Sequence, residues 1–315
     1  MLELPLVSII IRAYNQETYI AQAIQSAVNQ TYQNIQIVIV DDNSSDGTPE
    51  ILYSYSRKYP KVVEVYYNKK NIGELRNFNV ALGYCSGDFV AILDGDDLYF
   101  PDKIKTQVER MQNHEQCAVC YHDAYVFKEN LEDIFYSWSS RYGKREGNSL
   151  DLARFGPYPA TASALFRKEF IPSDGQNEAV RTQGDWLMLI ETVENSGGTI
   201  NYIDEFLAGI RIHESNVSHN WPNKLYSRFK TIEIANTIYP HLKQHLYAYE
   251  SDLRLIESLY YLSRIRIYES VKSFIKAIIK SFPNVLTLLR IPIRELIFFI
   301  KNGEILHPFE SRIIE

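Results

Sequence analysis

Apolar runs of strand length alternate with helical periodicity over the first 125 residues, and this alternation restricts the folds open to the chain. Five runs have the length and composition of buried strands: Val7–Ile11, Ile35–Val40, Val62–Tyr67, Phe89–Leu93 and Cys117–Tyr121. Between the first two runs, apolar residues recur at the three- and four-residue spacing of an amphipathic helix. Buried strands that alternate with helices predict an α/β fold with a mostly parallel central sheet sandwiched by helices.

The pattern weakens after about residue 130. Leu187–Val193 has the apolar character of a buried helix, and Ile200–Ile203 and Leu207–Ile212 have the length of two short strands. After Pro222 the chain has mostly helical patterning, which predicts a helical C-terminal extension.

Clusters of carboxylates follow two of the predicted strands. Asp41-Asp42 comes after the second run, and Asp94-Gly95-Asp96-Asp97 comes after the fourth. In parallel sheets ligands bind outside the carboxyl ends of the strands, where these clusters would lie. Three carboxylates within four residues repel one another unless a cation compensates, and oxygen ligands suit Mg²⁺ or Mn²⁺. The alternative for both clusters is a solvated turn whose aspartates cap the following helix.

The charge of the chain is unevenly distributed. The formal net charge is −6; from Lys224 onward there are 14 Lys/Arg and 9 Asp/Glu, against 19 and 30 before it. The acidic body argues against a nucleic-acid partner, whereas the basic end suits an anionic surface. The 3 cysteines are too few for a disulfide framework. With no signal-peptide pattern and no apolar run of membrane-spanning length, we expect a cytoplasmic protein.

Several common site motifs are missing. The sequence contains neither the P-loop pattern nor a GxGxxG after its first strand, which argues against a P-loop ATPase and a dinucleotide-binding domain. Cys117 and Cys120 match CxxC, but they lie in an apolar strand in which neighbouring side chains diverge. Buried core cysteines are favoured there over a zinc site.

Four ordered motifs together resemble those of the family-2 inverting glycosyltransferases. They are Val7–Ile11 with Tyr14-Asn15, Val40–Thr48, Gly87–Phe89 with Leu93–Asp97, and Gly184-Asp185. The resemblance covers roughly residues 5–220 and implies the glycosyltransferase A-type fold. It implies a catalytic domain over 1–222, with a nucleotide-binding half at 1–125 and an acceptor-binding half at 126–222, followed by the helical region 223–315.

The resemblance also implies roles for individual residues. Those implied for the nucleotide-sugar donor are Ala13, Tyr14, Asn15, Glu17, Asp42, Arg76, Asp94, Gly95, Arg211 and His213. Asp42 would accept the N3–H of uracil or thymine, which points to UDP, or else dTDP. Asp96 and His213 would bind the divalent metal, Mn²⁺ or Mg²⁺. A surface ion pair is the alternative for Arg76, helix capping for Glu17, and packing on the sheet for His213.

Asp185 is the implied general base. Inverting transfer is a single displacement in which a carboxylate takes the proton of the acceptor hydroxyl as the new bond forms. The family usually has Glu before this Asp, and Gly184 departs from that pattern. Trp186 would offer a flat apolar face to the acceptor sugar. The expected acceptor is a glycan or a lipid-linked glycan, as in polysaccharide or cell-envelope biosynthesis.

Other functions remain open from the sequence. A non-catalytic protein could keep this fold to bind a nucleotide or to scaffold a polysaccharide-assembly complex, but it would not need Asp42, Asp94, Asp96 and Asp185 together. A nucleotidyltransferase would have a Gly-rich, basic loop after the first strand, and Val7–Asn15 lacks one.

The C-terminal segment carries an amphipathic pattern. Its apolar residues at helical spacing are Val271, Phe274, Ile275, Ile278, Ile279 and Phe282. Beside them run Lys272, Lys276 and Lys280, and Arg290 and Arg294 continue the basic row around Leu286–Ile300. Such a helix lies on the inner face of a membrane, or packs on the catalytic domain or on a second subunit in a homodimer.

Overall fold

The computed structural model describes residues 4–213, 221–263, 269–270, 272–274 and 276. The chain divides into two compact units, which are described separately. The first comprises Met1–Leu152 and Pro157–His219, and the second comprises Ala153–Gly156 and Asn220–Glu315.

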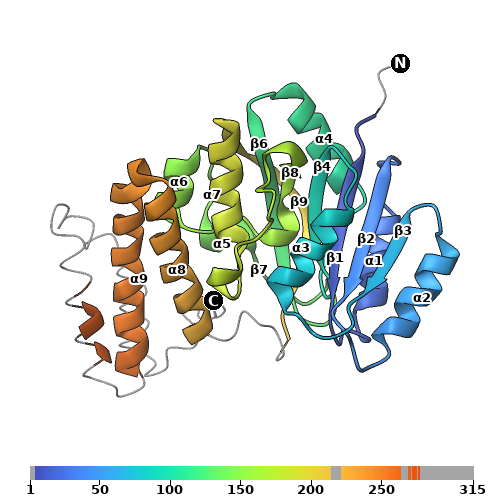
Figure 1. Cartoon of the computed structure of the whole chain (residues 1–315), viewed down its shortest axis with the longest axis horizontal. Helices are drawn as coiled ribbons and strands as arrows, with labels where there is room; N and C mark the ends of the chain where they lie inside the picture. The colour runs from blue at the N-terminus through green and yellow to red at the C-terminus, as the bar shows by residue number, and fades with distance from the viewer. Residues whose placement is uncertain (1–3, 214–220, 264–268, 271, 275, 277–315) are drawn as a thin grey trace. The chain divides into compact units, whose positions relative to one another are not determined.

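The first unit contains one twisted sheet flanked by helices (Figure 1). Its strands are β1 (Val7–Ala13), β2 (Ile35–Asp41), β3 (Val63–Tyr67), β4 (Phe89–Asp94), β5 (Leu98–Tyr99), β6 (Cys117–Phe127), β7 (Ile134–Ser137), β8 (Leu165–Arg167) and β9 (Thr199–Arg211). The strand order is β3-β2-β1-β4-β8-β6-β9-β5, with β7 paired to β6. The core β3-β2-β1-β4 is parallel throughout. The predicted α/β fold with a mostly parallel core is confirmed.

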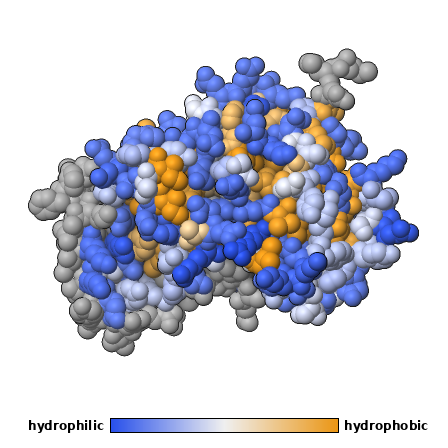
Figure 2. All heavy atoms as spheres, in the orientation of Figure 1, coloured by the Kyte–Doolittle hydropathy of each residue, from blue (hydrophilic) through white to orange (hydrophobic). Residues whose placement is uncertain are grey.

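Helices connect and cover these strands. They are α1 (Ile20–Val28), α2 (Thr48–Lys58), α3 (Glu74–Tyr84), α4 (Lys103–Asn113), α5 (Trp138–Tyr142), α6 (Ser149–Phe155) and α7 (Asp185–Ser196). Ile20, Ala23, Ile24 and Ala27 form the buried face of α1 and join the apolar side chains of β1 and β2 in one core. Hydrophilic residues predominate on the surface drawn in Figure 2, and apolar ones appear in separate patches.

The far half of the sheet differs from the sequence prediction. The two short strands expected at Ile200–Ile203 and Leu207–Ile212 are one strand, β9, whose middle residues Asp204, Glu205 and Phe206 are exposed. The strand continues through them because β6 pairs with β9 on both sides of the interruption. Antiparallel pairs, including β4 with β8, make this half of the sheet mixed.

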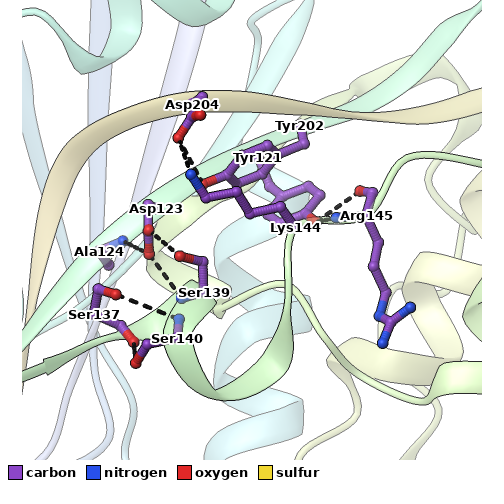
Figure 3. A network of polar contacts seen from close by, with 10 residues as sticks. All are labelled: Tyr121, Asp123, Ala124, Ser137, Ser139, Ser140, Lys144, Arg145, Tyr202 and Asp204. Carbon is purple, nitrogen blue, oxygen red and sulfur yellow. Dashed lines mark hydrogen bonds and ion pairs between the residues drawn. The ribbon is translucent and has the colours of Figure 1, made fainter.

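A buried carboxylate in β6 anchors the start of α5 (Figure 3). Asp123 is 1% exposed, and its Oδ1 accepts hydrogen bonds at 2.9 Å from the backbone N–H groups of Ala124 and Ser139. The Ser139 hydroxyl donates to the other carboxylate oxygen. Nearby, Lys144 pairs with Asp204 of β9 at 2.5 Å. Asp123 is therefore a structural group, although its buried position after an apolar run gives no such indication in the sequence.

The second unit is helical, as predicted for the C-terminal extension. It contains α8 (Trp221–Ile238) and α9 (Lys243–Ser263), and Arg154 pairs with Asp252 of α9 at 2.9 Å. Phe274, Lys272 and Lys276 are exposed, but the rest of the predicted amphipathic stripe lies outside the described residues. Among the described helices, none is both long enough and apolar enough to cross a membrane.

Candidate active site

The carboxylates of the turn after β4 lie beside an arginine side chain from the neighbouring strand. Arg12 and Asp94 are register partners at the ends of β1 and β4. Arg12 Nε donates to Asp94 Oδ1 at 2.9 Å, and the Arg12 Nη2 group contacts the same oxygen. Gly95 allows the turn to approach the loop before α1, because a Cβ there would lie 2.0 Å from Gln16 Oε1. The predicted donor contact of Gly95 stays a prediction.

The two predicted metal ligands face each other. His213 Nε2, from the residues after β9, lies 2.9 Å from Asp96 Oδ2. Both side chains are largely buried, at 20% and 12% exposed. The structure thus brings together two residues that are more than a hundred positions apart in the sequence.

Crowding and burial change the protonation of this turn. Burial is the largest cause that raises the pKa of Asp94, and the charges of Asp96 and Asp185 act in the same direction, against Arg12. The pKa of Asp97 is raised well above its usual value by burial and by Asp96 and Asp94. Burial and mutual repulsion therefore disfavour full ionisation of this turn, and Arg12 opposes them at Asp94.

Asp185, the predicted base, is the first residue of α7. Its Oδ2 accepts a hydrogen bond from the Thr161 hydroxyl at 2.7 Å, and its Oδ1 accepts one from the Trp186 backbone N–H at 3.1 Å. The Asp185 charge raises the pKa of both Asp94 and Glu74, behind burial as the main cause. Asp185, Asp94 and Glu74 therefore lie within electrostatic reach of one another, around Arg12.

The predicted nucleobase loop is joined to the loop after β2. Ala13 is buried and ends β1, whereas Tyr14 is 48% exposed. Asn15 Oδ1 accepts from the Ser45 backbone N–H at 2.8 Å, and the Asn15 N–H donates to Ser44 Oγ at 2.8 Å. Asn15 adopts a φ of 50°, a left-handed conformation that Asn tolerates.

Glu17 caps this second loop. Its Oε2 accepts from the Gly47 backbone N–H at 2.6 Å, immediately before α2. Glu17 therefore has a capping role, but at the start of α2 and not at the helix that follows it, and its contact with the nucleotide stays a prediction.

Most acceptor positions of the Asp42 carboxylate are taken by hydrogen bonds from the protein itself. It is 3% exposed, and its Oδ1 accepts from Asn68 Nδ2 at 3.0 Å and from the Ile72 N–H at 2.8 Å. Its Oδ2 accepts from the Gly73 N–H at 2.8 Å. A carboxylate has about four acceptor positions, so Asp42 retains room for one further donor.

Three predicted contacts need correction or remain open. Trp186 is 1% exposed and its Nε1 donates to the Leu152 carbonyl, so no face of the ring is open to a sugar. Arg211 is 2% exposed, and its guanidinium donates to the carbonyls of Asp96 and Glu129, so it is not placed to bind a diphosphate. Arg76 forms an exposed ion pair with Glu178 at 2.6 Å, as the alternative predicted.

The sequence analysis missed Arg12, Glu74 and Thr161. Arg12 directly follows the predicted strand Val7–Ile11 and lies within β1, but its partner follows only from the register between β1 and β4. Glu74 and Thr161 carry no motif, and the fold alone brings them near Asp94 and Asp185.

The donor set at Asp96 and His213 fits a divalent cation. A carboxylate oxygen and an imidazole nitrogen are ligands that suit Mn²⁺, and a cation would relieve the repulsion among the carboxylates around them. Within the described residues, no cluster of three or more His, Cys, Asp or Glu side chains could hold a metal. Two protein ligands leave coordination positions for water and phosphate oxygens, as is usual for Mg²⁺.

The comparison with protein families identifies the chain. The model of Glycosyl transferase family 2 matches residues 8–174, which include β1 to β8 and the turn after β4. The chain belongs to glycosyl transferase family 2. An uncharacterized Mycobacterium tuberculosis protein is 29% identical over 219 residues, which are 68% of this chain but only 60% of that relative's length.

Solved structures of low sequence identity have the same fold. The 1–349 fragment of Staphylococcus aureus TarS in complex with UDP-GlcNAc has a TM-score of 0.57 and 16% identity, covering 88% of this chain and 91% of that one. The Pyrobaculum calidifontis mannosyltransferase PcManGT, in complex with GDP-Man and Mn²⁺, has a TM-score of 0.61 and 15% identity, covering 96% and 83%.

Proposed function

We propose that this family-2 protein is an inverting glycosyltransferase, which moves a sugar from a UDP-sugar to a hydroxyl of a glycan or lipid-linked glycan. The observation that carries the proposal is the arrangement around Arg12. The predicted base Asp185 lies within electrostatic reach of Asp94, next to the facing pair of Asp96 and His213. The nucleotide sugars bound to the two solved neighbours support the donor class.

Asp185 would take the proton of the acceptor hydroxyl. The acceptor oxygen forms its bond to the anomeric carbon while the bond from that carbon to the diphosphate oxygen breaks, so the configuration inverts. Each Asp185 oxygen accepts one hydrogen bond, from Thr161 or from the Trp186 backbone, which leaves lone pairs to receive the proton. Thr161 orients the carboxylate, and a base positioned in this way contributes about 10²–10⁴-fold to the rate.

Asp96 and His213 would hold Mn²⁺ or Mg²⁺. The bound cation would compensate the charge that develops on the leaving diphosphate. Arg12 keeps Asp94 in place at the same turn, so that three carboxylates can remain close together.

The loops after β1 and β2 would bind the base. Asp42 has one acceptor position left, which matches the single N3–H of uracil or thymine. Tyr14 is exposed on the joined loop beside it. Because one solved neighbour carries a uridine nucleotide and another a guanosine nucleotide, the family's fold alone does not select the base.

Calorimetry tests the donor, with UDP titrated in the presence and absence of Mn²⁺ and with GDP as the control. We expect UDP to bind more tightly than GDP and its affinity to rise with Mn²⁺. Equal affinities for the two nucleotides, or no effect of the metal, would contradict the proposal. A screen of UDP-sugars for Mn²⁺-dependent hydrolysis then identifies the sugar, and the anomeric NMR coupling of a transfer product tests inversion.

A further inference from the structure

One aromatic ring lies against the last residue of β9 and against a residue that follows the strand. Tyr19, the residue immediately before α1, stacks on the His213 imidazole with a centroid distance of 5.0 Å and an interplanar angle of 26°. The Arg211 guanidinium lies over the same ring, 4.7 Å from its centroid. Tyr19 therefore links the start of the first helix to the residues that enter the site nearly two hundred positions later.

Arg211 in turn fixes the backbone around Asp96. Its Nε donates to the Asp96 carbonyl at 3.0 Å, and its backbone N–H donates to Asp97 Oδ1 at 2.9 Å. Its Nη2 donates to Gln22 Oε1 at 2.8 Å, one turn of α1 after Tyr19. The buried guanidinium thus ties the acidic turn to the first turn of α1.

Asp96 is consequently held from two directions. Arg211 binds its carbonyl, His213 faces its carboxylate, and the Tyr19 ring contacts both of these residues. We propose that Tyr19 is a positioning residue of the metal site, which keeps the Asp96 carboxylate and the His213 imidazole in the orientation that binds the cation. The inference rests on the proposed function, because it assumes that these two residues bind a divalent metal.

The proposal follows from the role of outer contacts in metal sites. A ligand that can rotate freely must lose that freedom when the metal binds, so the contacts that fix it raise the affinity. The Tyr19 ring supplies one stacking contact and one cation–π contact, each of which is modest in energy. Loss of the ring should therefore weaken metal binding by about 3- to 10-fold without removing either ligand.

Matched substitutions of tyrosine test this role on the full chain. Tyr19→Leu removes the ring, Tyr19→Phe keeps it, and Tyr53→Leu is the control on α2, where Tyr53 is 63% exposed. The measurements are UDP affinity in the presence and absence of Mn²⁺, thermal unfolding, and NMR of the histidine ring protons without metal, with His213 assigned through His213→Gln.

We expect Tyr19→Leu to weaken Mn²⁺-dependent UDP binding and leave metal-free UDP binding unchanged. The His213 ring protons should lose the upfield shift that a stacked aromatic ring produces. Tyr19→Phe should keep both properties within about twofold of the wild type, and Tyr53→Leu should match the wild type.

Two results would overturn the inference alone. These are an unchanged Mn²⁺ effect in Tyr19→Leu, and a Tyr19→Phe variant as defective as Tyr19→Leu, which would assign the effect to the hydroxyl. In the first case, a lower unfolding temperature would show that the ring serves packing only. If the wild-type protein itself bound UDP without any Mn²⁺ effect, the proposed function would fail and the inference with it.

Discussion

Two aspartate clusters follow two strands of the same parallel sheet, yet their surroundings are opposite. After β2, Asp42 accepts three hydrogen bonds from neutral protein donors, and Asp41 accepts from the backbone N–H and hydroxyl of Ser44. After β4, Asp94, Asp96 and Asp97 crowd together, and the pKa values of Asp94 and Asp97 are raised by burial and by their mutual repulsion.

The difference separates two uses of the same residue type. A carboxylate that accepts several N–H donors organises the chain, as Asp42 organises the loop at Ile72 and Gly73. Carboxylates that are buried close together repel one another, and their free energy falls when a cation binds. We therefore expect the carboxylates at the end of β2 to hold the loops in place, and those at the end of β4 to attract the cation.

The largest expected effect comes from Asp185, which belongs electrostatically to the β4 cluster. Asp185→Asn should lower kcat by about 10²–10⁴-fold, because the amide cannot take the acceptor proton. Donor affinity should stay within a few-fold of the wild type, since the Thr161 hydrogen bond can be kept. Steady-state transfer kinetics and UDP calorimetry measure the two quantities. Near-normal turnover would remove Asp185 as the base.

Asp96→Asn tests whether the carboxylates after β4 bind a cation. We expect the Mn²⁺-dependent part of UDP affinity to fall by at least about 10-fold, the effect usual for disturbing a metal site. The unfolding temperature without metal should not fall, because the substitution removes one of three carboxylates that repel one another. Asp42→Asn is the matched control, and its Mn²⁺ response should equal that of the wild type. A similar loss in both variants would erase the distinction between the clusters.

Asp42→Ala tests the structural role of the β2 cluster. Loss of the Asp42 carboxylate leaves the Ile72 and Gly73 N–H groups without their acceptor, which should destabilise the protein by about 1–3 kcal/mol. Denaturant titration of the full chain, followed by tryptophan fluorescence, measures this loss of unfolding free energy. An unchanged unfolding free energy, combined with a lost preference for UDP over GDP, would instead make Asp42 mainly a ligand for the base.

The sequence predicts the parallel half of the molecule well for a physical reason. Strands β1, β2 and β4 are buried on both faces, so their apolar runs are continuous and their polar ends are visible. β9 was wrongly divided because its exposed residues Asp204 and Glu205 resemble a loop, although the pairing with β6 continues.

The site was predictable only where a motif marks it. Asp96 and His213 meet as the resemblance implies, but the pairing of Arg12 with Asp94 depends on strand register, which no local pattern encodes. Trp186 was misjudged because an aromatic residue at the start of a helix gives no sign of which way its ring turns. Its ring is buried with Nε1 donating to the Leu152 carbonyl of α6, a contact between distant segments.

The pH dependence of stability offers a smaller test of the β4 cluster. A carboxyl whose pKa is higher in the folded than in the unfolded protein binds more protons when folded, so stability falls as the pH rises above the unfolded pKa. Asp97 is such a group, and in the metal-free protein Asp97→Asn should raise the unfolding temperature at pH 7. The gain should shrink as the pH is lowered toward 4. A gain that is independent of pH would show that repulsion is not its cause.

Arg76→Gln should have the smallest effect, although Arg76 follows the loop that Asp42 organises. Its side chain is 60% exposed and pairs with Glu178, and exposed ion pairs contribute about 0–1 kcal/mol. We therefore expect almost unchanged stability and an unchanged KM for the donor. Glu178→Gln is the matched control, because it breaks the same pair and leaves the arginine in place. A donor KM that rises in Arg76→Gln but not in Glu178→Gln would show that Arg76 leaves its ion pair to contact the diphosphate or the sugar, and would extend the donor site beyond the ends of β2 and β4.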